Sequence, residues 1–349
     1  MGGFGRCNVS RFEVLILDDR HEVYDEEREV LRKIDARVAV NPTNNEEEIC
    51  KLVSNVDALI VNLAPITSRV IASMQKCRCV SRYGVGYDNV DLVELTAHGI
   101  YLVTVQDFCS EDVADHTLAL WMDCVRKISR KDRLVRQGKW NLLRAQKCYR
   151  VRGKTYGIIG CGRIGALLRR RLTSFDLGRV IAWDPHKCPK EAEEQNVELV
   201  DLETLCRESD YISIHVPLVP STRRLIDDEF LSRVKPTAIL VNTSRGGVVD
   251  EKSLVQALKN GRLACAGLDV FETEPLPHDS ELLRLENVTL CDHEGWYSEE
   301  SMHDLKVRAA MNVVEILTAK RPKYLVNNPV SPRSVERSDD VEALRSQRR

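Results

Sequence analysis

The sequence predicts an α/β fold with two domains, each built on a parallel β-sheet. Its length of 349 residues suits about two domains of roughly 150 residues each. Short and nearly continuous apolar segments recur along the chain, as expected of parallel strands that are buried on both faces. Polar helical stretches separate these segments, and this alternation is typical of α/β proteins.

The charge balance and hydropathy exclude several functional classes. The 51 basic and 53 acidic residues leave a net charge of -2, which argues against a nucleic-acid binder and against a polybasic membrane anchor. No apolar segment approaches the ~18 residues of a membrane span. The N-terminal residues lack the apolar core of a secretory signal. We therefore expect a cytoplasmic protein without a nucleic-acid or membrane partner.

Twelve cysteines are scattered through the chain, and no two have the spacing of a zinc knuckle or a redox motif. A chain of this length does not need disulfides to compensate for a small core. The cysteines are therefore expected to be reduced thiols, with neither a metal nor a disulfide framework.

The first part of the chain predicts four strands and two helices. The strands are expected at 12–17, 57–62, 79–82 and 100–105, with a helix at 44–55. A long helical pattern follows at 111–137, with Ser110 as its expected N-cap.

A second alternating series begins after Gly153. Its strands are expected at 155–159, 180–183, 211–216, 238–242, 264–269 and 288–291, with helices at 165–174, 251–259 and 298–320. The predicted domains are 9–118 with 299–330, and 119–298. The charged tail at 331–349 has no aromatic residue and is expected to be mobile.

A dinucleotide-binding fingerprint opens the second series. Gly160, Gly162 and Gly165 have the spacing Gly-x-Gly-x-x-Gly between an expected strand and an expected helix. The first glycine permits a tight turn, the second lets a pyrophosphate approach the backbone, and the third lets helix and strand pack closely. The free N–H groups of the helix N-terminus favour an anion there. This pattern predicts a dinucleotide cofactor.

Asp184 ends the next strand, where a carboxylate can accept both ribose hydroxyls of NAD and repel the 2′-phosphate of NADP. The alternative is a solvated aspartate in a turn. Lys187 nearby keeps some tolerance of NADP open. Asp184 nevertheless makes NAD the predicted cofactor.

Reactive side chains follow three of the later strands. Arg245 comes after 238–242, Asp269 and Glu274 come after 264–268, and His293 comes after 288–291. Ligands of open α/β sheets bind beyond the carboxyl ends of the strands. These side chains are therefore expected to converge where a nicotinamide lies. Singly, each could equally be a surface or core residue.

Four further motifs, in this order, make the sequence resemble the D-isomer-specific 2-hydroxyacid dehydrogenases from about residue 10 to residue 330. They are RYGVGYDNVD at 82–91, EDVADHT at 111–117, NTSRGGVVD at 242–250 and DVFETEP at 269–275. The motif WYSEE at 296–300 is most similar to the branch of the C-terminal-binding-protein corepressors. The resemblance implies two Rossmann-like domains: a flavodoxin-like substrate domain and an inserted NAD-binding domain with a doubly wound parallel sheet. It also implies an active site in the cleft between them and a homodimer.

The resemblance further implies that Arg245, Glu274 and His293 are the catalytic set, and the chemistry agrees. Reduction of a 2-keto acid puts negative charge on the carbonyl oxygen, so a proton donor is needed, and histidine suits this role near neutral pH. Glu274 would hold the ring and favour its charged form. Arg245 offers a fixed fork of donors to the substrate carboxylate.

Other residues match cofactor or substrate positions of the family. Asp269 would accept a hydrogen bond from the nicotinamide carboxamide, and backbone amides of Val85 and Gly86 would hold the substrate carboxylate. The predicted cofactor residues are Gly160, Gly162, Arg163, Ile164, Gly165, Asp184, Val216, Pro217, Thr222, Thr243, Ser244, Arg245, Asp269, His293 and Gly295. The predicted substrate residues are Arg82, Val85, Gly86, Arg245 and Trp296.

Some positions depart from the family or carry two interpretations. Asp292 stands where the family usually has proline, and Glu294 stands where the corepressor branch typically has alanine. Both carboxylates should favour a protonated His293, and they could repel a dianionic substrate. Trp296 is either a wall of the substrate pocket or a dimer contact. His116 is interpreted as a structural or domain-interface residue.

The sequence leaves three alternative functions open. A formate-type dehydrogenase lacks the carboxylate partner of the histidine, so Glu274 argues against it. A phosphoglycerate dehydrogenase is possible, although no regulatory domain follows residue 330. An NAD(H)-sensing corepressor-like binding protein could retain the catalytic residues, so the motifs do not exclude it.

Overall fold

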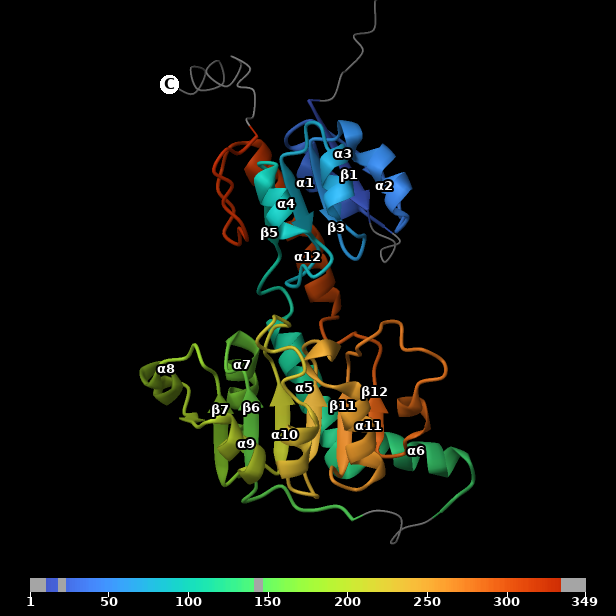
Figure 1. Cartoon of the computed structure of the whole chain (residues 1–349), viewed down its shortest axis with the longest axis vertical. Helices are drawn as coiled ribbons and strands as arrows, with labels where there is room; N and C mark the ends of the chain where they lie inside the picture. Colours follow the sequence, from blue (N-terminus) through green and yellow to red (C-terminus); the bar gives the residue numbers. More distant parts are fainter. Residues whose placement is uncertain (1–10, 18–22, 141–146, 334–349) are drawn as a thin grey trace, which may run out of the picture. The chain divides into compact units, whose positions relative to one another are not determined.

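The computed structural model describes residues 11–17, 23–140 and 147–333, and it divides into two compact units (Figure 1). The first unit is Met1–Phe108 with Glu299–Arg349, and the second is Cys109–Ser298. All but the first three residues of the predicted mobile tail lie outside the described residues. Both units are α/β, so the predicted fold class is confirmed. Within the described ranges, no helix has the length and apolarity needed to cross a membrane.

The first unit contains a five-stranded parallel sheet in the order β2-β1-β3-β4-β5, which is the flavodoxin-like order. Its strands are β1 Phe12–Leu17, β2 Ala36–Val40, β3 Ala58–Val61, β4 Cys79–Arg82 and β5 Tyr101–Thr104. Its α-helices are α1 Asp25–Arg32, α2 Glu46–Leu52, α3 Ser68–Ser73, α4 Leu92–Ala97 and α12 Glu299–Leu317. A short 3₁₀ helix, η1 Val53–Asn55, extends α2.

The second unit contains a seven-stranded parallel sheet in the order β12-β11-β10-β9-β6-β7-β8. Its strands are β6 Thr155–Ile159, β7 Arg179–Trp183, β8 Glu198–Leu199, β9 Tyr211–Ile214, β10 Ile239–Asn242, β11 Cys265–Leu268 and β12 Val288–Leu290. Its α-helices are α5 Ser110–Arg126, α6 Ile128–Arg136, α7 Arg163–Arg171, α8 Pro189–Glu194, α9 Leu202–Glu208, α10 Asp228–Arg233 and α11 Glu251–Lys259. Short 3₁₀ helices lie at η2 Leu172–Phe175, η3 Gly246–Val248 and η4 Glu281–Arg284.

Two strands were not predicted, and both lie at the edge of a sheet. The side chains of β2 alternate between half-buried and exposed, and β8 has only two residues. Neither strand forms the continuous apolar segment that marks a strand buried on both faces. Their apolar pattern is therefore too weak to stand out from a loop.

The prediction of a single helix at 111–137 is wrong, because the helical conformation is interrupted at Lys127. This residue has the left-handed conformation (φ 60°) and separates α5 from α6. The Asp123 carboxylate accepts hydrogen bonds from the N–H and the hydroxyl of Ser129 at 2.7 and 2.9 Å, which satisfies donors at the start of α6. Ser110 is the first residue of α5, and Cys109 is its N-cap.

The whole of α5 belongs to the second unit, whereas the predicted domain boundary at residue 118 falls inside this helix. The helix packs against α7 and against strands β10 and β11. Its Trp121 is fully buried and meets Tyr156, Phe175 and Tyr211 edge-on, with ring centroids 5.0–5.1 Å apart. These contacts join α5 to the second sheet at Trp121.

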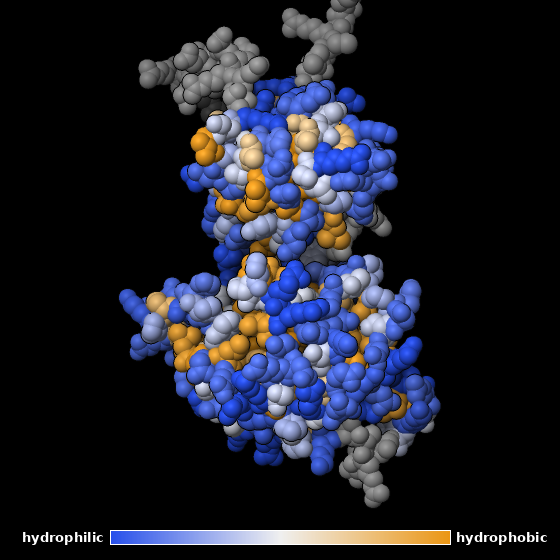
Figure 2. All heavy atoms as spheres, viewed as in Figure 1, coloured by the Kyte–Doolittle hydropathy of each residue, from blue (hydrophilic) through white to orange (hydrophobic). Residues whose placement is uncertain are grey.

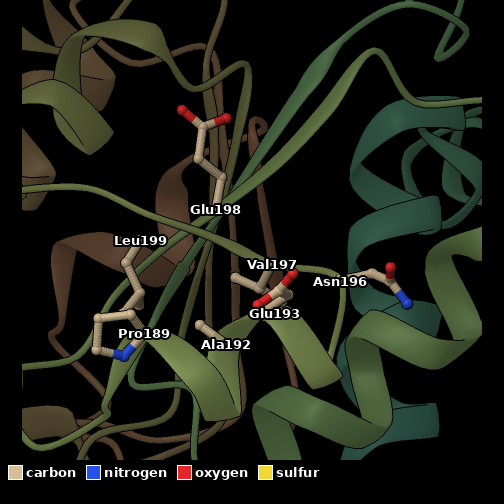
Figure 3. A pocket seen from close by; sticks show the side chains of 7 residues that line it. All are labelled: Pro189, Ala192, Glu193, Asn196, Val197, Glu198 and Leu199. Atoms are coloured by element: carbon tan, nitrogen blue, oxygen red, sulfur yellow. The ribbon is translucent and has the colours of Figure 1, made fainter.

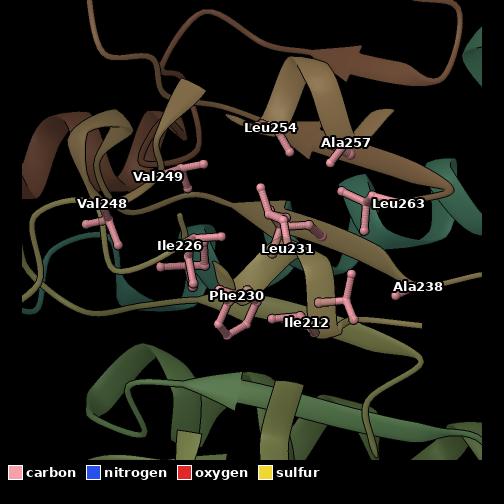
Figure 4. Close-up of a cluster of buried hydrophobic side chains, with 14 of the residues drawn as sticks. Ile212, Ile226, Phe230, Leu231, Ala238, Val248, Val249, Leu254, Ala257 and Leu263 are labelled. Atoms are coloured by element: carbon pink, nitrogen blue, oxygen red, sulfur yellow. The ribbon is translucent and has the colours of Figure 1, made fainter. Parts of the chain in front are cut away.

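Apolar side chains cover the two faces of the second sheet. On one face, Phe230 and Leu231 of α10 and Leu254 of α11 pack over the central strands (Figure 4). The cluster around Trp121 forms the other layer. Burial of one such side chain contributes about 1.5–3 kcal/mol. The surface in Figure 2 is mostly hydrophilic, as this burial requires.

Candidate active site

The glycine-rich loop leaves no room for side chains at two of its three glycines. Gly160 has φ +88°, and a Cβ there would lie 2.8 Å from Val216 Cγ1 and 2.9 Å from the carbonyl carbon of His215. A Cβ on Gly165 would lie 2.6 Å from the oxygen of Gly160. Gly162 is the N-cap of α7, and nothing lies within 4 Å of its Cβ position. The loop therefore packs tightly against its neighbours at Gly160 and Gly165 and leaves open space at Gly162, as a pyrophosphate site requires.

Asp184, directly after β7, is anchored to this loop. Its Oδ2 accepts a hydrogen bond from the N–H of Cys161 at 2.9 Å, and its Oδ1 accepts one from the N–H of His186 at 3.0 Å. Lys187 Nζ donates to the carbonyl oxygen of Cys161 at 2.7 Å. The sequence predicted the position of Asp184 but not these bonds, which fix the carboxylate beside the loop.

The segment after β9 lies against the same loop. Val216 is buried next to Gly160, and the N–H of Val219 donates to the Thr222 hydroxyl at 2.9 Å. The Thr222 hydroxyl also contacts the carbonyl oxygen of Pro217. Of the three predicted residues in this segment, Val216 therefore lies at the glycine loop, and Thr222 fixes the turn that contains Pro217.

Arg245 is held where the segments after β10 and β11 meet. A Cβ on Gly246 would lie 1.8 Å from the carbonyl carbon of Phe271, so only glycine allows this approach. Arg245 Nη1 donates to the carbonyl oxygen of Ser244 at 2.7 Å, and the Ser244 hydroxyl donates to Asn242 Oδ1 at 2.9 Å. This close packing brings the guanidinium into the electrostatic environment of Glu274.

Thr243, just before Arg245, is tied to α5. Its hydroxyl lies 2.8 Å from the hydroxyl of Thr117, which itself donates to the carbonyl oxygen of Val113 at 2.7 Å. Thr117 was not singled out from the sequence, since a threonine inside a helical pattern carries no signal of its own. The hydrogen bond fixes the β10 end against the helix.

Glu274 and His293 form the central pair of the site. His293 Nδ1 lies 2.6 Å from Glu274 Oε2, and Glu274 Oε1 accepts the N–H of Phe271 at 3.0 Å. Burial opposes ionisation of Glu274, but the hydrogen bond and charge of His293, the Phe271 N–H and Arg245 together hold its pKa below the usual range. Each side chain is about a third exposed. Because Nδ1 is engaged, Nε2 is the ring nitrogen left for a substrate.

The residues beside His293 differ in exposure. Asp292 and Glu294 are exposed, so their carboxylates face solvent beside His293. Trp296 is half-buried and meets Tyr297 edge-on, with centroids 5.7 Å apart. His293 itself has φ 62°, in the left-handed region, which turns the chain sharply after β12.

Asp269 is buried, and both of its oxygens are engaged by the segment that follows β12. Oδ1 accepts the N–H of Glu294 at 3.1 Å, and Oδ2 accepts the N–H of Gly295 at 3.0 Å. A Cβ on Gly295 would lie 2.8 Å from Asp269 Oδ2 and 3.0 Å from the ring of His116. Gly295 is therefore required for the packing of this corner.

His116, which the sequence left as a structural residue, pairs with Asp269. Its Nε2 lies 3.2 Å from Asp269 Oδ1 but lacks hydrogen-bond geometry, so the contact is an ion pair. Asp269 and, after it, Cys291 raise the pKa of His116 to about 10 against the opposing effect of burial. Burial alone would raise the pKa of Asp269, yet His116 and the two amides lower it. Both groups are therefore charged near neutral pH.

Three predicted substrate residues lie in the first unit. Arg82 ends β4, and its guanidinium lies over Gly84, where φ is +113° and a Cβ would meet Nη1. Val85 is 47% exposed. The predicted site residues thus form two groups: Arg82, Val85 and Gly86 in the first unit, and all the others in the second.

An open hollow at the edge of the second sheet contains none of these residues (Figure 3). It is lined by Pro189, Ala192, Glu193, Asn196, Val197, Glu198 and Leu199. It lies between α8 and the edge strand β8, and it carries no chemistry that matches the site.

Comparison with known proteins decides the family. Residues 118–295 match the model of the D-isomer specific 2-hydroxyacid dehydrogenase NAD-binding domain. A glyoxylate reductase of Korarchaeum cryptofilum is 43% identical over 290 residues, which cover 82% of this chain and 87% of the relative. The chain belongs to the D-isomer specific 2-hydroxyacid dehydrogenase family.

Two further relatives agree with this assignment. The crystal structure of a glyoxylate reductase from Paecilomyes thermophila has a TM-score of 0.81 and 27% identity, covering 90% of this chain and 98% of that one. A D-3-phosphoglycerate dehydrogenase of Methanocaldococcus jannaschii is 37% identical over 323 residues, covering 92% of this chain and 60% of the relative.

The family assignment also sets the reaction. This 2-hydroxyacid dehydrogenase is an NAD-dependent oxidoreductase that interconverts a 2-keto acid and a D-2-hydroxy acid. The predicted family and cofactor are thus confirmed. The placement in the corepressor branch and the roles of the individual site residues stay predictions.

The ion pair of His116 and Asp269 makes the stability of the second unit depend on pH. Because folding raises the pKa of His116 from 6.5 to about 10, its contribution is fully present below pH 6.5 and is lost as the pH rises through 10. We expect the ion pair to contribute about 1–2 kcal/mol to the free energy of unfolding at low pH, because the ring is partly exposed to solvent. Thermal midpoints of the wild type and His116→Gln should therefore differ most at pH 6 and least at pH 10.

The matched control is His278→Gln, because His278 is exposed in a loop of the same unit. It should leave the midpoint unchanged at every pH. A His116→Gln difference that stays constant between pH 6 and pH 10 would contradict the ion pair.

Proposed function

We propose that this dehydrogenase reduces a small 2-keto acid of the glyoxylate type, with His293 as proton donor. The observation that carries the proposal is the 2.6 Å contact of His293 Nδ1 with Glu274, which leaves Nε2 for the substrate carbonyl. Relatives named glyoxylate reductase, 37–43% identical over most of the chain, support the substrate class. The direct test is NADH oxidation with glyoxylate, hydroxypyruvate and aryl pyruvates.

The residues of the second unit support a division of roles. When bound, NADH supplies the hydride that reduces the keto carbon. His293 protonates the carbonyl oxygen as negative charge develops there. Glu274 holds the ring by its ionised carboxylate and stabilises the charged imidazole. Arg245 binds the substrate carboxylate.

The glycine loop and its surroundings fit the cofactor proposed for them. Gly160 and Gly165 let the loop pack closely against the sheet, Gly162 leaves open space at the N-cap of α7, and the N-terminus of this helix favours a pyrophosphate. Asp184 would accept the ribose hydroxyls, and Asp269 the nicotinamide carboxamide. Of the other predicted cofactor residues, Arg163 and Ile164 lie in the first turn of α7.

A phosphoglycerate substrate is the second candidate. Its support is the 37% identity to the Methanocaldococcus jannaschii enzyme, of which this chain spans 60%. The exposed carboxylates of Asp292 and Glu294 beside His293 argue against a phosphate-bearing dianion. Activity with 3-phosphohydroxypyruvate that exceeds activity with glyoxylate would favour this candidate.

We also propose that the enzyme is a homodimer, and that it is cytosolic. Helix α6 buries none of its residues, yet Ile128 and Val135 are 60% and 52% exposed, and Trp140 just beyond it is 75% exposed. Exposed large apolar side chains on one short segment support an interaction surface there. The cysteines of the described residues are free thiols, which suits a reducing compartment.

Replacement of His293 tests the mechanism. His293→Ala should lower kcat on glyoxylate about 10²–10⁴-fold, because it removes the proton donor. The Kd of NADH should change little, since the histidine is expected to make little contact with the adenosine end of the cofactor. The exposed His278→Ala is the matched control. Near-normal turnover of His293→Ala would remove this residue from the mechanism.

The cofactor preference should respond to Asp184. Asp184→Ser removes the carboxylate that repels a 2′-phosphate, so the ratio of kcat/KM for NADH over NADPH should fall or invert. Asp279→Ser, at an exposed loop position, is the control. A wild-type enzyme that already prefers NADPH would show that Asp184 has another role.

Trp296 tests whether the substrate pocket has an apolar wall. If the indole lines the pocket, each added methylene of the 2-keto acid should gain roughly 0.8 kcal/mol, or about fourfold in affinity. Trp296→Ala should erase this preference and spare activity on glyoxylate. If Trp296 is instead a dimer contact, the variant should dissociate with unchanged relative rates. A flat chain-length profile in the wild type would exclude the pocket role.

The dimer surface is tested by Trp140→Glu. A charge at this exposed indole should weaken association and shift sedimentation toward the monomer. Leu283→Glu, which places the same charge at a residue 50% exposed outside α6, should leave the dimer intact. A wild type that sediments as a monomer would refute the proposal.

A further inference from the structure

We propose that His116, Asp269 and Cys291 form a binding site for Zn²⁺ or a similar borderline-soft cation. Their ligand atoms all lie within 4.8 Å of one another, although the three residues come from α5, the end of β11 and the end of β12. This triad belongs entirely to the second unit.

The spacing of the ligand atoms suits a tetrahedral ion. Zinc lies about 2.0–2.3 Å from nitrogen, oxygen and sulfur ligands, so two ligands of one ion are roughly 3.3–3.8 Å apart. His116 Nε2 and Asp269 Oδ1 are already 3.2 Å apart. Nε2 is buried without a hydrogen-bond partner, and its separation from Asp269 needs little change to admit an ion.

The surroundings hold two of the three ligands in place. Asp269 is oriented by the amides of Glu294 and Gly295, and the backbone N–H of Cys291 donates to the carbonyl oxygen of Leu268 at 2.8 Å. Such supporting bonds to ligands are typical of metal sites.

The charges of the three ligands and their exposure to solvent also suit a divalent cation. The Asp269 carboxylate and a Cys291 thiolate together balance two positive charges, while His116 and Cys291 release their protons so that His116 binds as the neutral imidazole. The His116 side chain is 24% exposed and Cys291 is half-buried, so an ion can enter from solvent. Three protein ligands leave a fourth position for water. A thiolate and an imidazole favour Zn²⁺, Co²⁺ or Cd²⁺ over Mg²⁺ and Ca²⁺.

Occupancy of the triad would regulate the enzyme. This step rests on the proposed role of Asp269 as acceptor for the nicotinamide carboxamide. An ion that occupies Asp269 removes this acceptor and places positive charge beside the nicotinamide position. The cation is therefore an inhibitor that competes with NADH.

Cobalt binding tests the site without turnover. Co²⁺ added to the metal-free full-length protein should give tetrahedral d–d bands and a thiolate-to-cobalt charge-transfer band with a 1:1 end point. Cys291→Ser should lose the charge-transfer band, whereas Cys188→Ser, at an exposed cysteine, should keep it. His116→Ala should lower the affinity by on the order of tenfold or more. A missing band, or one that survives in Cys291→Ser, would overturn the site.

The regulatory step has its own readout. Zn²⁺ should raise the apparent Kd of NADH, measured by fluorescence, about tenfold in the wild type and not in Cys291→Ser, each compared with its own metal-free value. Cobalt binding through Cys291 with an unchanged NADH affinity would refute the competition. If no 2-keto acid is reduced, the proposed function fails while the cobalt result still decides the metal site.

Discussion

The parallel order of the seven-stranded sheet is the constraint on which the candidate site depends. Parallel strands place their carboxyl ends at one edge, so the segments after β6, β7, β9, β10, β11 and β12 meet there. Each segment contributes a different chemical group, from the glycine loop after β6 to the imidazole after β12. No single segment contains the site. Its geometry therefore depends on the sheet, and a change in strand register would displace several groups together.

At this shared edge, close approaches between backbone segments fix the distances between the site residues. Gly246 lets the segment that carries Arg245 lie against Phe271, whose N–H holds Glu274. Glu274 in turn holds His293. The charge of each member stabilises its neighbour, which explains why the pKa of Glu274 is lowered although burial opposes its ionisation. The glycine at 246 thus acts on the imidazole through two intermediate contacts.

The sequence predicted those features that local patterns determine. The buried strands of both sheets and helix α11 lie close to where their apolar patterns indicated. The edge strands β2 and β8 were missed because exposure weakens the apolar pattern, and the break at Lys127 was missed because no glycine or proline marks it. The motifs predicted Glu274 and His293, whose contact the structure then shows. His116 and Cys291 could not be paired with Asp269 beforehand, because only the packing of α5 on β11 and β12 brings them together.

Asp269 shows how a shared edge produces competing demands on one group. Its two oxygens accept the amides of Glu294 and Gly295 and so hold the segment that presents His293. The same carboxylate pairs with His116 and lies beside Cys291. A carboxylate has about four lone-pair positions, and two are used by these amides. A nicotinamide carboxamide and a cation must therefore compete with His116 for the lone-pair positions that remain. The arrangement that makes Asp269 a rigid acceptor is the same one that makes it a metal ligand, so selection for cofactor binding does not by itself remove the affinity for a cation.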